Sequence, residues 1–281
     1  MTGRLSFALI GEHIAYSRSP AVFEAIFRAD GVEGSFRVHE VSAAAFAEEF
    51  PRLLRSGVHG LAVTIPHKER VAPFLDDLDP VARALGAVNS IAIADRLRGF
   101  NTDVAGFRFA LENYRAVVAG RPALVLGCGG AARAAVYALH RHFGVPSIVI
   151  TSRRAETLER TVERLRKGMA GLEITPAPAA RLLPLDRPVG VVVNATPLGG
   201  GNHPRELPLP KAFDWTRAAV YYDLNYNDDN QAVGCAREAG VAALDGAAML
   251  VAQAIESYRR WTGRTVPFDP VFAAAFPRRT R

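Results

Sequence analysis

The second half of the chain contains four short, mainly apolar runs separated by segments with a helical pattern. The runs occupy residues 124–126, 148–150, 189–193 and 220–224. Strands that lack a polar face must be buried on both sides, which requires helices above and below a parallel sheet. Apolar residues recur at helical spacing in residues 131–142, 156–167 and 229–239. We therefore predict a doubly wound α/β domain over about residues 105–240.

The first half of the chain also alternates strand-like runs with helical patterns. Strands are predicted at residues 5–10, 60–65 and 88–92, and helices at residues 20–29 and 66–78. The strand character changes after residues 101–107. We therefore predict a separate α/β domain over residues 1–104.

The C-terminal part of the chain is predicted to be helical. Residues 245–261 form one long helical pattern that cannot extend the sheet. We expect residues 241–281 to return and pack on the first domain. The segment 175–188 holds four prolines and is predicted to be a connection.

The chain is basic, with 34 Lys and Arg against 28 Asp and Glu, and its calculated pI is about 9.7. Such a pI is typical of proteins that bind nucleic acid. However, the arginines are spread along all 281 residues, and the one dense run is Arg278, Arg279 and Arg281. Aromatic and basic residues are not interleaved as in single-strand binders. We expect a solvated arginine-rich surface and small anionic ligands, with no nucleic-acid partner.

The two cysteines, Cys128 and Cys235, are too few for a disulfide framework or a zinc site. We predict no bound metal and a reducing, cytoplasmic location. No apolar run approaches the roughly 18 residues of a membrane span. The first ten residues lack the apolar core and cleavage site of a signal peptide, so no membrane partner is expected.

Residues 124–132 read Leu-Val-Leu-Gly-Cys-Gly-Gly-Ala-Ala, a strand followed by a glycine-rich turn and the start of a helix. In such G-x-G-x-x-A turns, Gly127 permits the tight turn and Gly129 lets a pyrophosphate approach the backbone. The small Ala132 allows the helix to pack closely on the strand. The helix N-terminus offers free N–H groups and a partial positive charge to an anion. The pattern favours a Rossmann-type dinucleotide site.

The end of the next predicted strand indicates which dinucleotide is bound. An NAD enzyme carries an acid there for the ribose hydroxyls, but this chain has Ser152, Arg153 and Arg154. Guanidinium groups bind a 2′-phosphate with paired hydrogen bonds. NADP is therefore favoured over NAD, although the arginines can also be two members of an arginine-rich surface.

Two hydroxyls stand just before the helix predicted at residues 20–29. Ser19 precedes Pro20, the usual arrangement of an N-cap residue followed by proline, so capping explains Ser19. Capping does not explain Ser17.

Lys68 falls in the first turn of the helix predicted at residues 66–78. A cation there opposes the helix dipole at a cost of roughly 0.3–1 kcal/mol, so packing alone would not select it. The same field is expected to lower the pKa of the ammonium group, which suits proton transfer. Asn89 stands where a helix gives way to a strand. In the run Asn101-Thr102-Asp103, Asp103 either caps the next helix or serves a site.

Taken together, these segments resemble the shikimate dehydrogenase family, in order and along nearly the whole chain. The matching segments are residues 14–20, 63–69, 86–89, 101–103, 127–131, 194–197, 245–253 and 261–263. The resemblance implies a substrate domain, a Rossmann-type domain and a C-terminal helix that returns to the first. It also implies NADPH-dependent, reversible reduction of 3-dehydroshikimate to shikimate, a step of chorismate and aromatic amino-acid biosynthesis.

The resemblance further assigns roles to residues. Lys68 is implied to be the catalytic acid/base, with Asp103 as its partner. The implied substrate contacts are Ser17, Ser19, Thr64, Asn89, Asp103, Tyr226 and Gln253, the two serines holding the substrate carboxylate. The implied cofactor contacts are Gly127, Cys128, Gly129, Gly130, Ala131, Ser152, Arg153, Arg154, Thr196, Leu224, Gly246 and Met249.

The chemistry agrees with this assignment. Hydride arriving at the C3 carbonyl leaves an alkoxide-like oxygen, which a cationic lysine stabilises and protonates. The charge of Asp103 favours the ammonium form and is expected to raise the pKa of Lys68, against the helix-end effect. The sequence does not decide between the two effects.

The chain departs from the family pattern at three places. Ser152-Arg153-Arg154 replaces Asn-Arg-Thr, and residues 225–228, Asn-Tyr-Asn-Asp, replace Val-Tyr-x-Pro, so the loop after Tyr226 loses a proline. Cys128 stands where alanine is common. A thiol at a helix N-terminus can have a depressed pKa, and we predict that its alkylation blocks cofactor binding. The simpler alternative is an inert small side chain.

Other functions remain open at this point. A relative acting on quinate or aminoshikimate, possibly with NAD, would share the fold. A nucleotide-sensing regulator would be expected to lose Lys68 or Asp103, and both are present. The sequence leaves the oligomeric state open between a monomer and a homodimer.

Overall fold

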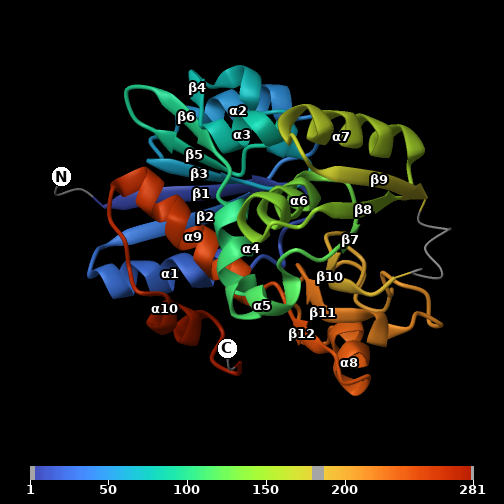
Figure 1. Cartoon of the computed structure of the whole chain (residues 1–281). Coiled ribbons are helices and arrows are strands. Elements are labelled where there is room, and N and C mark those ends of the chain that lie inside the picture. The colour runs from blue at the N-terminus through green and yellow to red at the C-terminus, as the bar shows by residue number, and fades with distance from the viewer. Residues whose placement is uncertain (1–3, 179–186, 280–281) are drawn as a thin grey trace. The chain divides into compact units, whose positions relative to one another are not determined.

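The computed structural model describes residues 4–178 and 187–279, which form two compact units (Figure 1). The first unit comprises Met1–Gly106 and Leu250–Arg281, and the second comprises Phe107–Met249. The sequence predicted that the middle domain ends at residue 240. The second unit extends to Met249 because a short strand after residue 240 joins its sheet.

The first unit is built on one mixed sheet. Its strands, in chain order, are β1 (Leu5–Gly11), β2 (Gly34–Glu40), β3 (Gly60–Val63), β4 (Asp77–Leu78), β5 (Ser90–Ile93) and β6 (Leu97–Phe100). They lie in the order β2-β1-β3-β5-β6-β4. β1 pairs in parallel with β2 and β3, whereas β5 is antiparallel to both β3 and β6. The α/β fold class predicted for this region is confirmed.

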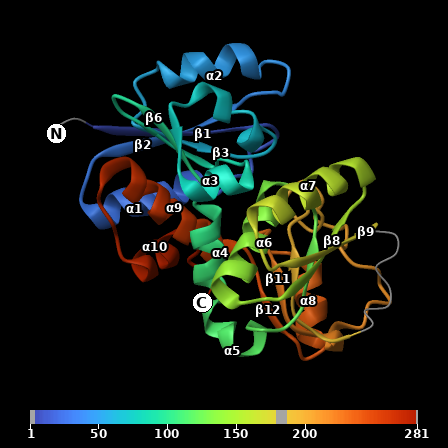
Figure 2. The same cartoon turned by 45° about the horizontal axis from the view of Figure 1, so that its top comes forward.

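Helices cover both faces of this sheet (Figure 2). They are α1 (Ser19–Asp30), α2 (Phe46–Leu54), α3 (Pro80–Leu85), the first part of α4 (Asp103–Leu111), most of α9 (Ala247–Thr262) and α10 (Phe268–Ala275). Figure 2 shows α2 on one face, and α1 and α10 on the other. The face under α2 forms an apolar core of Ile10, Leu61 and Phe50.

The end of the chain completes the opposite core of the first unit. Trp261 stacks on Phe7 and Phe23, with ring centroids 4.9 and 5.4 Å apart. Tyr258 also packs edge-on against Phe7 and donates a hydrogen bond of 2.6 Å to Asp30. Residues from α9 therefore pack directly on the first strand and first helix of the chain.

The helix predicted at residues 66–78 does not form. Two 3₁₀ turns, η1 (His67–Glu69) and η2 (Ala72–Phe74), occupy this stretch before β4. Pro73 explains the difference, because an internal proline lacks an N–H donor and clashes with the carbonyl four residues earlier. The apolar spacing was therefore misleading in this segment.

The second unit contains a fully parallel sheet. Its strands are β7 (Ala123–Leu126), β8 (Ser147–Ser152), β9 (Glu173–Pro178), β10 (Val189–Asn194), β11 (Ala218–Asp223) and β12 (Ala242–Leu244). Every described pairing is parallel, and the order β9-β8-β7-β10-β11-β12 is the 3-2-1-4-5-6 arrangement of a Rossmann domain. The predicted doubly wound sheet is confirmed.

The helices of this unit lie on both faces of its sheet, with α6 and α7 on one side and α8 on the other (Figures 1 and 2). Besides the end of α4, they are η3 (Glu112–Tyr114), α5 (Arg115–Val118), α6 (Gly130–Phe143), α7 (Ala155–Gly168), η5 (Trp215–Arg217) and α8 (Gln231–Glu238). The first part of residues 175–188, predicted to be a connection, belongs to β9. This strand tolerates proline because it lies at the sheet edge. Residues 179–186 of that segment, and Arg281 of the basic tail, lie outside the described residues.

Within residues 4–178 and 187–279, no helix is long and apolar enough to span a membrane.

Candidate active site

Lys68 and Asp103 form the most enclosed ion pair among the described residues of the first unit. Lys68 Nζ lies 2.6 Å from Asp103 Oδ2, and the two side chains are 15% and 8% exposed. Lys68 is carried by η1 and Asp103 is the first residue of α4. Because η1 is a single short turn, the prediction that a helix dipole acts on Lys68 is wrong. The nearest charge to the ammonium is the carboxylate.

Asn89 holds the other oxygen of this carboxylate. Asn89 Nδ2 donates to Asp103 Oδ1 at 2.8 Å, and Asn89 Oδ1 accepts from the Thr102 backbone N–H at 2.7 Å. Both oxygens of Asp103 are therefore bound by side chains of the site. The alternative that Asp103 serves only as a helix cap does not fit this arrangement.

Two residues of α9 join the same cluster. Thr102 Oγ1 lies 2.9 Å from Ser257 Oγ, and Gln253 Oε1 lies 3.4 Å from both Asn89 Nδ2 and Thr102 Oγ1. Asn89, Thr102 and Ser257 are each less than 4% exposed. The sequence singled out Asn89 and Gln253, and the structure brings both to the Lys68–Asp103 pair.

Ser17 lies on the turn between β1 and α1, and Ser19 is the first residue of α1. The N-cap position of α1 is Arg18 and has no side-chain cap, so the prediction that Ser19 is the N-cap is wrong. Instead, Ser17 Oγ accepts a hydrogen bond of 3.2 Å from the Ser19 backbone N–H. The Ser19 hydroxyl has no hydrogen-bond partner among the described residues, which leaves it free for a ligand.

Thr64 lies beside this turn. A Cβ placed on Gly11 would lie 2.5 Å from Thr64 Cγ2 and 3.0 Å from Ile14 Cγ2, so β1, the serine turn and the end of β3 are in close contact. Thr64 donates its backbone N–H to Ile10. Its hydroxyl has no hydrogen-bond partner in the described part of the chain.

The glycine-rich turn of the second unit joins β7 to α6. Gly127 has φ +104°, and a Cβ there would lie 2.9 Å from the Ala195 carbonyl oxygen. Gly129 is the N-cap of α6 without a side-chain cap, and a Cβ built on it meets nothing within 4 Å. This open backbone fits the approach of a phosphate to the first N–H groups of α6, those of Gly130 and Ala131.

Cys128 lies inside this turn. The residue is 8% exposed, and its carbonyl oxygen accepts a hydrogen bond of 3.1 Å from Thr161 Oγ1. The bond ties the turn to α7. The effect of alkylating the thiol stays a prediction.

The arginines expected to choose the cofactor follow β8. Ser152 ends the strand, and its Oγ accepts from the Arg154 backbone N–H at 3.2 Å. Arg153 and Arg154 are exposed, and neither guanidinium pairs with a carboxylate of the described residues. Both are available to an anion.

The remaining predicted cofactor contacts gather after β10 and β11. Thr196 follows β10 and packs beside Gly127, since a Cβ there would lie 3.3 Å from Thr196 Cγ2. Gly246 packs on the segment after β11, where its N–H donates to the Asn225 carbonyl at 2.8 Å. A Cβ on Gly246 would lie 2.1 Å from the Leu224 carbonyl oxygen, so only glycine fits. Met249, three residues after Gly246, is buried. Tyr226 lies two residues after Leu224 and also belongs to the second unit.

The sequence reasoning missed a buried hydrogen-bond network at the carboxyl end of β11. Asp223 at the end of β11 is fully buried and accepts hydrogen bonds from Asn194, Tyr221 and Asn225. Burial raises the pKa of Asp223, and the hydrogen bonds that it accepts oppose this shift. A single acidic residue at the end of an otherwise apolar strand was the available signal.

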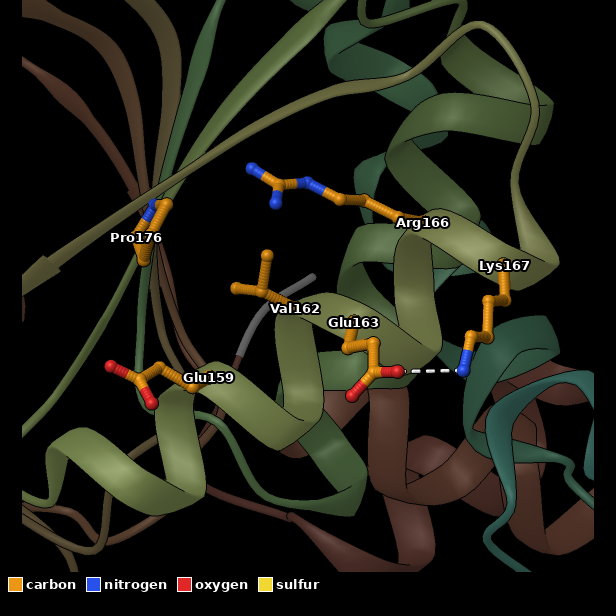
Figure 3. Close-up of a pocket in the computed structure, with 6 residues that line it drawn as sticks. All are labelled: Glu159, Val162, Glu163, Arg166, Lys167 and Pro176. Atoms are coloured by element: carbon orange, nitrogen blue, oxygen red, sulfur yellow. Dashed lines mark hydrogen bonds and ion pairs between the residues drawn. The ribbon is translucent and has the colours of Figure 1, made fainter.

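A hollow of about 430 Å³ lies elsewhere on the second unit, between α7 and β9 (Figure 3). Three of its four charged side chains already have partners, since Lys167 pairs with Glu163 at 2.6 Å and Arg166 donates to the Ile174 carbonyl. It contains none of the predicted site residues. Within the described residues, no group of three or more His, Cys, Asp or Glu is placed to hold a metal.

Comparison with known families gives two matches. The model of the shikimate dehydrogenase substrate binding domain matches residues 9–91, and that of the shikimate 5′-dehydrogenase C-terminal domain matches residues 246–276. A curated relative, shikimate dehydrogenase (NADP(+)) of Moorella thermoacetica, is 38% identical over 269 residues, which cover 92% of this chain and 88% of the relative.

Solved structures of the same family are also similar. Shikimate 5-dehydrogenase of Thermus thermophilus, in complex with NADP(H) and shikimate, has a TM-score of 0.80 at 31% identity and covers 96% of this chain and 98% of its own. Quinate dehydrogenase of Corynebacterium glutamicum, in complex with NAD, has a TM-score of 0.83 at 27% identity, with the same coverage. With a family model over its N-terminal region and relatives of this identity along its length, the chain belongs to the shikimate dehydrogenase family.

Proposed function

We propose that this chain is an NADP-dependent shikimate dehydrogenase, an oxidoreductase that reversibly reduces 3-dehydroshikimate to shikimate in aromatic amino-acid biosynthesis. The observation that carries the proposal is the enclosed Lys68–Asp103 pair, set among the hydroxyl and amide groups of Asn89, Thr102 and Gln253. An ammonium beside polar groups of this kind suits a polyhydroxylated ring. The relatives named shikimate dehydrogenase (NADP(+)) support the same activity.

Lys68 is the proton donor in this proposal. Reduction of the C3 carbonyl places negative charge on its oxygen, and a nearby ammonium both stabilises and protonates that oxygen. Nζ has three N–H donors and gives one to Asp103 Oδ2, so two remain for the substrate. Asp103 orients the ammonium, and Asn89 holds the carboxylate from its other side.

Further residues of the first unit bind the substrate. The free hydroxyls of Ser19 and Thr64, together with Ser17, suit the carboxylate and ring hydroxyls. Gln253 and Asn89 complete the set from α9 and from the segment before β5. Tyr226 of the second unit stays a proposed contact on the basis of the sequence resemblance alone.

The residues of the second unit fit a dinucleotide. Gly127, Cys128, Gly129, Gly130 and Ala131 are proposed to cradle the pyrophosphate, with Gly129 leaving the necessary space. Ser152, Arg153 and Arg154 are proposed to hold the 2′-phosphate, and Thr196, Leu224, Gly246 and Met249 the nicotinamide half. When bound, NADPH supplies the hydride.

A direct assay tests the proposal. The purified chain should oxidise shikimate with NADP, followed by absorbance of the reduced cofactor. Lys68→Ala should lower kcat about 10²–10⁴-fold, the usual contribution of a general acid, with a much smaller change in shikimate binding. Negligible turnover of the wild type with shikimate and NADP would overturn the function, and near-normal turnover of Lys68→Ala would remove Lys68 from catalysis.

The similarity to a quinate dehydrogenase in complex with NAD supports one alternative. A quinate or aminoshikimate enzyme would share the fold and the ion pair. Arg153 and Arg154, with no acid beside them at the end of β8, favour NADP. Ratios of kcat/KM for the two cofactors with shikimate and quinate distinguish these activities, and a regulator without catalysis would turn over neither substrate.

The cellular setting stays a prediction. Cys128 and Cys235 are both free thiols, which suits the expected cytoplasmic location. We propose small molecules as the ligands and either a monomer or a homodimer as the assembly.

A further inference from the structure

Asp223 is an unusual carboxylate because it is fully buried and has no cationic partner among the described residues. Four donors converge on it. Asn194 Nδ2 and Tyr221 Oη bind Oδ2 at 3.0 and 2.8 Å, and the backbone N–H and Nδ2 of Asn225 bind Oδ1 at 2.9 and 2.8 Å. A buried charge is costly unless hydrogen bonds replace water. These four hydrogen bonds hold the Asp223 carboxylate in one position and connect it to the residues that donate them.

The residues around Asp223 also hold the loop after β10, residues 195–200, which we call the β10 loop. Asn194 Oδ1 accepts from the backbone N–H and the hydroxyl of Thr196 at 3.0 and 2.7 Å. Asn225 Nδ2 lies 3.1 and 3.2 Å from the carbonyl oxygens of Thr196 and Leu198. A Cβ on Gly200 would lie 2.3 Å from Asn225 Oδ1. The amide of Asn225 thus links Asp223 to the β10 loop.

The β10 loop lies where a Rossmann domain binds its dinucleotide. β7 and β10 are the neighbouring strands at which the strand order reverses, and ligands bind beyond their carboxyl ends. The Gly127 turn contacts this loop through the Ala195 carbonyl. A loop held in one conformation before binding loses less entropy when the ligand arrives.

Asn225 also stands in a segment that contains no proline. Residues 225–228 are Asn-Tyr-Asn-Asp, so proline cannot restrict this segment. Side-chain hydrogen bonds from Asn225 provide a different restraint.

We propose that Asp223 and Asn225 are positioning residues that hold the β10 loop in its cofactor-binding conformation before the cofactor binds. This inference rests on the proposed function, because it assumes that the loop binds NADP(H). Neither the Asp223 nor the Asn225 side chain needs to touch the cofactor. By holding the β10 loop, the two side chains raise the affinity of the protein for NADP(H).

The test compares Asn225→Ala with Asn230→Ala. Asn230 follows the same strand and caps α8, where its Oδ1 accepts from the Val233 backbone N–H at 3.1 Å. Asn225→Ala should raise the Kd for NADPH about tenfold, the effect of losing roughly 1.4 kcal/mol of hydrogen bonding. Its kcat at saturating NADP and its KM for shikimate should stay within twofold of the wild type. Asn230→Ala should lower Tm but leave the Kd for NADPH unchanged.

Several results would overturn the inference. It fails if Asn225→Ala binds NADPH within twofold of the wild type, or if its losses in NADPH and shikimate binding are equal and follow a lower Tm. If the wild type itself does not bind NADPH, the proposed function fails first. The two failures are therefore distinguishable.

Hydrogen exchange of the wild type gives a measurement that needs no variant. The backbone N–H groups of Thr196, Leu198 and Asn225 bond to side chains rather than to a strand. They should be protected in the protein without NADPH. Exchange at the rate of an unstructured chain until NADPH is added would show that the loop is not preset, against the proposal.

Discussion

His67 shows how a single residue supports the turn that carries Lys68. The imidazole is fully buried, stacks on Phe46 at 4.6 Å, and lies with Nε2 2.7 Å from the Val41 carbonyl oxygen. Because a carbonyl only accepts, Nε2 carries the hydrogen. Nδ1 has no hydrogen-bond partner among the described residues, so a second proton there would be buried without an acceptor. Burial, with Arg70 nearby, lowers the pKa of His67, and the Val41 carbonyl and Glu12 oppose this shift.

This depressed pKa predicts how stability depends on pH. Below about pH 6.5 the unfolded chain binds a proton at this histidine that the folded chain resists. The free energy of unfolding of the wild type should therefore fall as pH drops from about 7.5 to about 5. His67→Gln keeps a donor for Val41 but cannot titrate, so its difference from the wild type should shrink towards acid pH. Urea midpoints at several pH values measure this, and a constant difference would contradict it.

The limits of sequence reasoning are also clear at this scale. Lys68 and Asp103 are 35 positions apart, and only the family resemblance predicted that they act together. Ser257 could have been found from helical spacing, because it lies one turn after Gln253. Asn225 could not, since its contacts depend on which loops the sheet order brings together.

Among the elements, the turn from β7 to α6 was predicted most accurately. Glycines, an apolar strand and the helical pattern are local signals, so α6 was expected at 131–142 and occurs at Gly130–Phe143. β2 was missed because only Phe36 and Val38 mark its apolar face, and because its residues, at the sheet edge, are mostly half-buried. The segment at 66–78 has the apolar spacing of a helix, but Pro73 prevents one from forming.

The two ends of α6 provide a matched test of the turn. Gly127 and Gly144 both have positive φ, but a Cβ on Gly144 meets nothing within 4 Å. Gly144→Ala should therefore cost only about 1–2 kcal/mol of stability, the penalty of an L-residue in the left-handed region, and leave NADPH binding unchanged. Gly127→Ala must also displace the Ala195 carbonyl, so it should weaken NADPH binding at least tenfold. Titrations of NADPH fluorescence decide this, and equal affinities of the two variants would contradict it.

Helix α9 offers a second test at the same scale. Glu256 accepts hydrogen bonds from Arg259 and Arg260. Burial raises the pKa of Glu256, but these bonds and charges outweigh it and lower the pKa overall. Glu256→Gln should cost about 0.5–1 kcal/mol at pH 7, since the arginines are partly exposed. The cost should begin to shrink as pH falls below the ordinary pKa of a glutamate, and it should disappear only where the folded carboxyl, whose pKa is lower, is also protonated. A cost that is the same at about pH 6 and about pH 3 would contradict this.

At the scale of the whole molecule, the arginines fall into two groups: those that pair with nearby acids, and those that are available to bind an anion. Many surface arginines pair with acids one turn away, such as Arg52 with Glu49 and Arg28 with Glu24, and such pairs contribute little to stability. Arg153 and Arg154 have no such partner in the described residues.

Because Arg153 and Arg154 lie in the second unit and are available to an anion, we predict that NADP stabilises this unit more than NAD does. NADP at about 100 times its Kd should stabilise the unit that binds it by about 2.7 kcal/mol. Hydrogen exchange should show that protection in residues 107–249, and NAD at the same concentration should protect them far less. Equal protection by the two cofactors would remove the arginines from cofactor selection.

The packing of Trp261 and Tyr258 on Phe7 has a consequence for synthesis of the chain. Residues 107–249 are contiguous, so the second unit can fold while the ribosome is still adding the end of the chain. The first unit emerges earlier but lacks part of its core until residue 261 has been made. The first unit, although its residues before 107 are made before the second unit, is therefore completed after it, and a chain that stops at residue 250 would also lack Gln253.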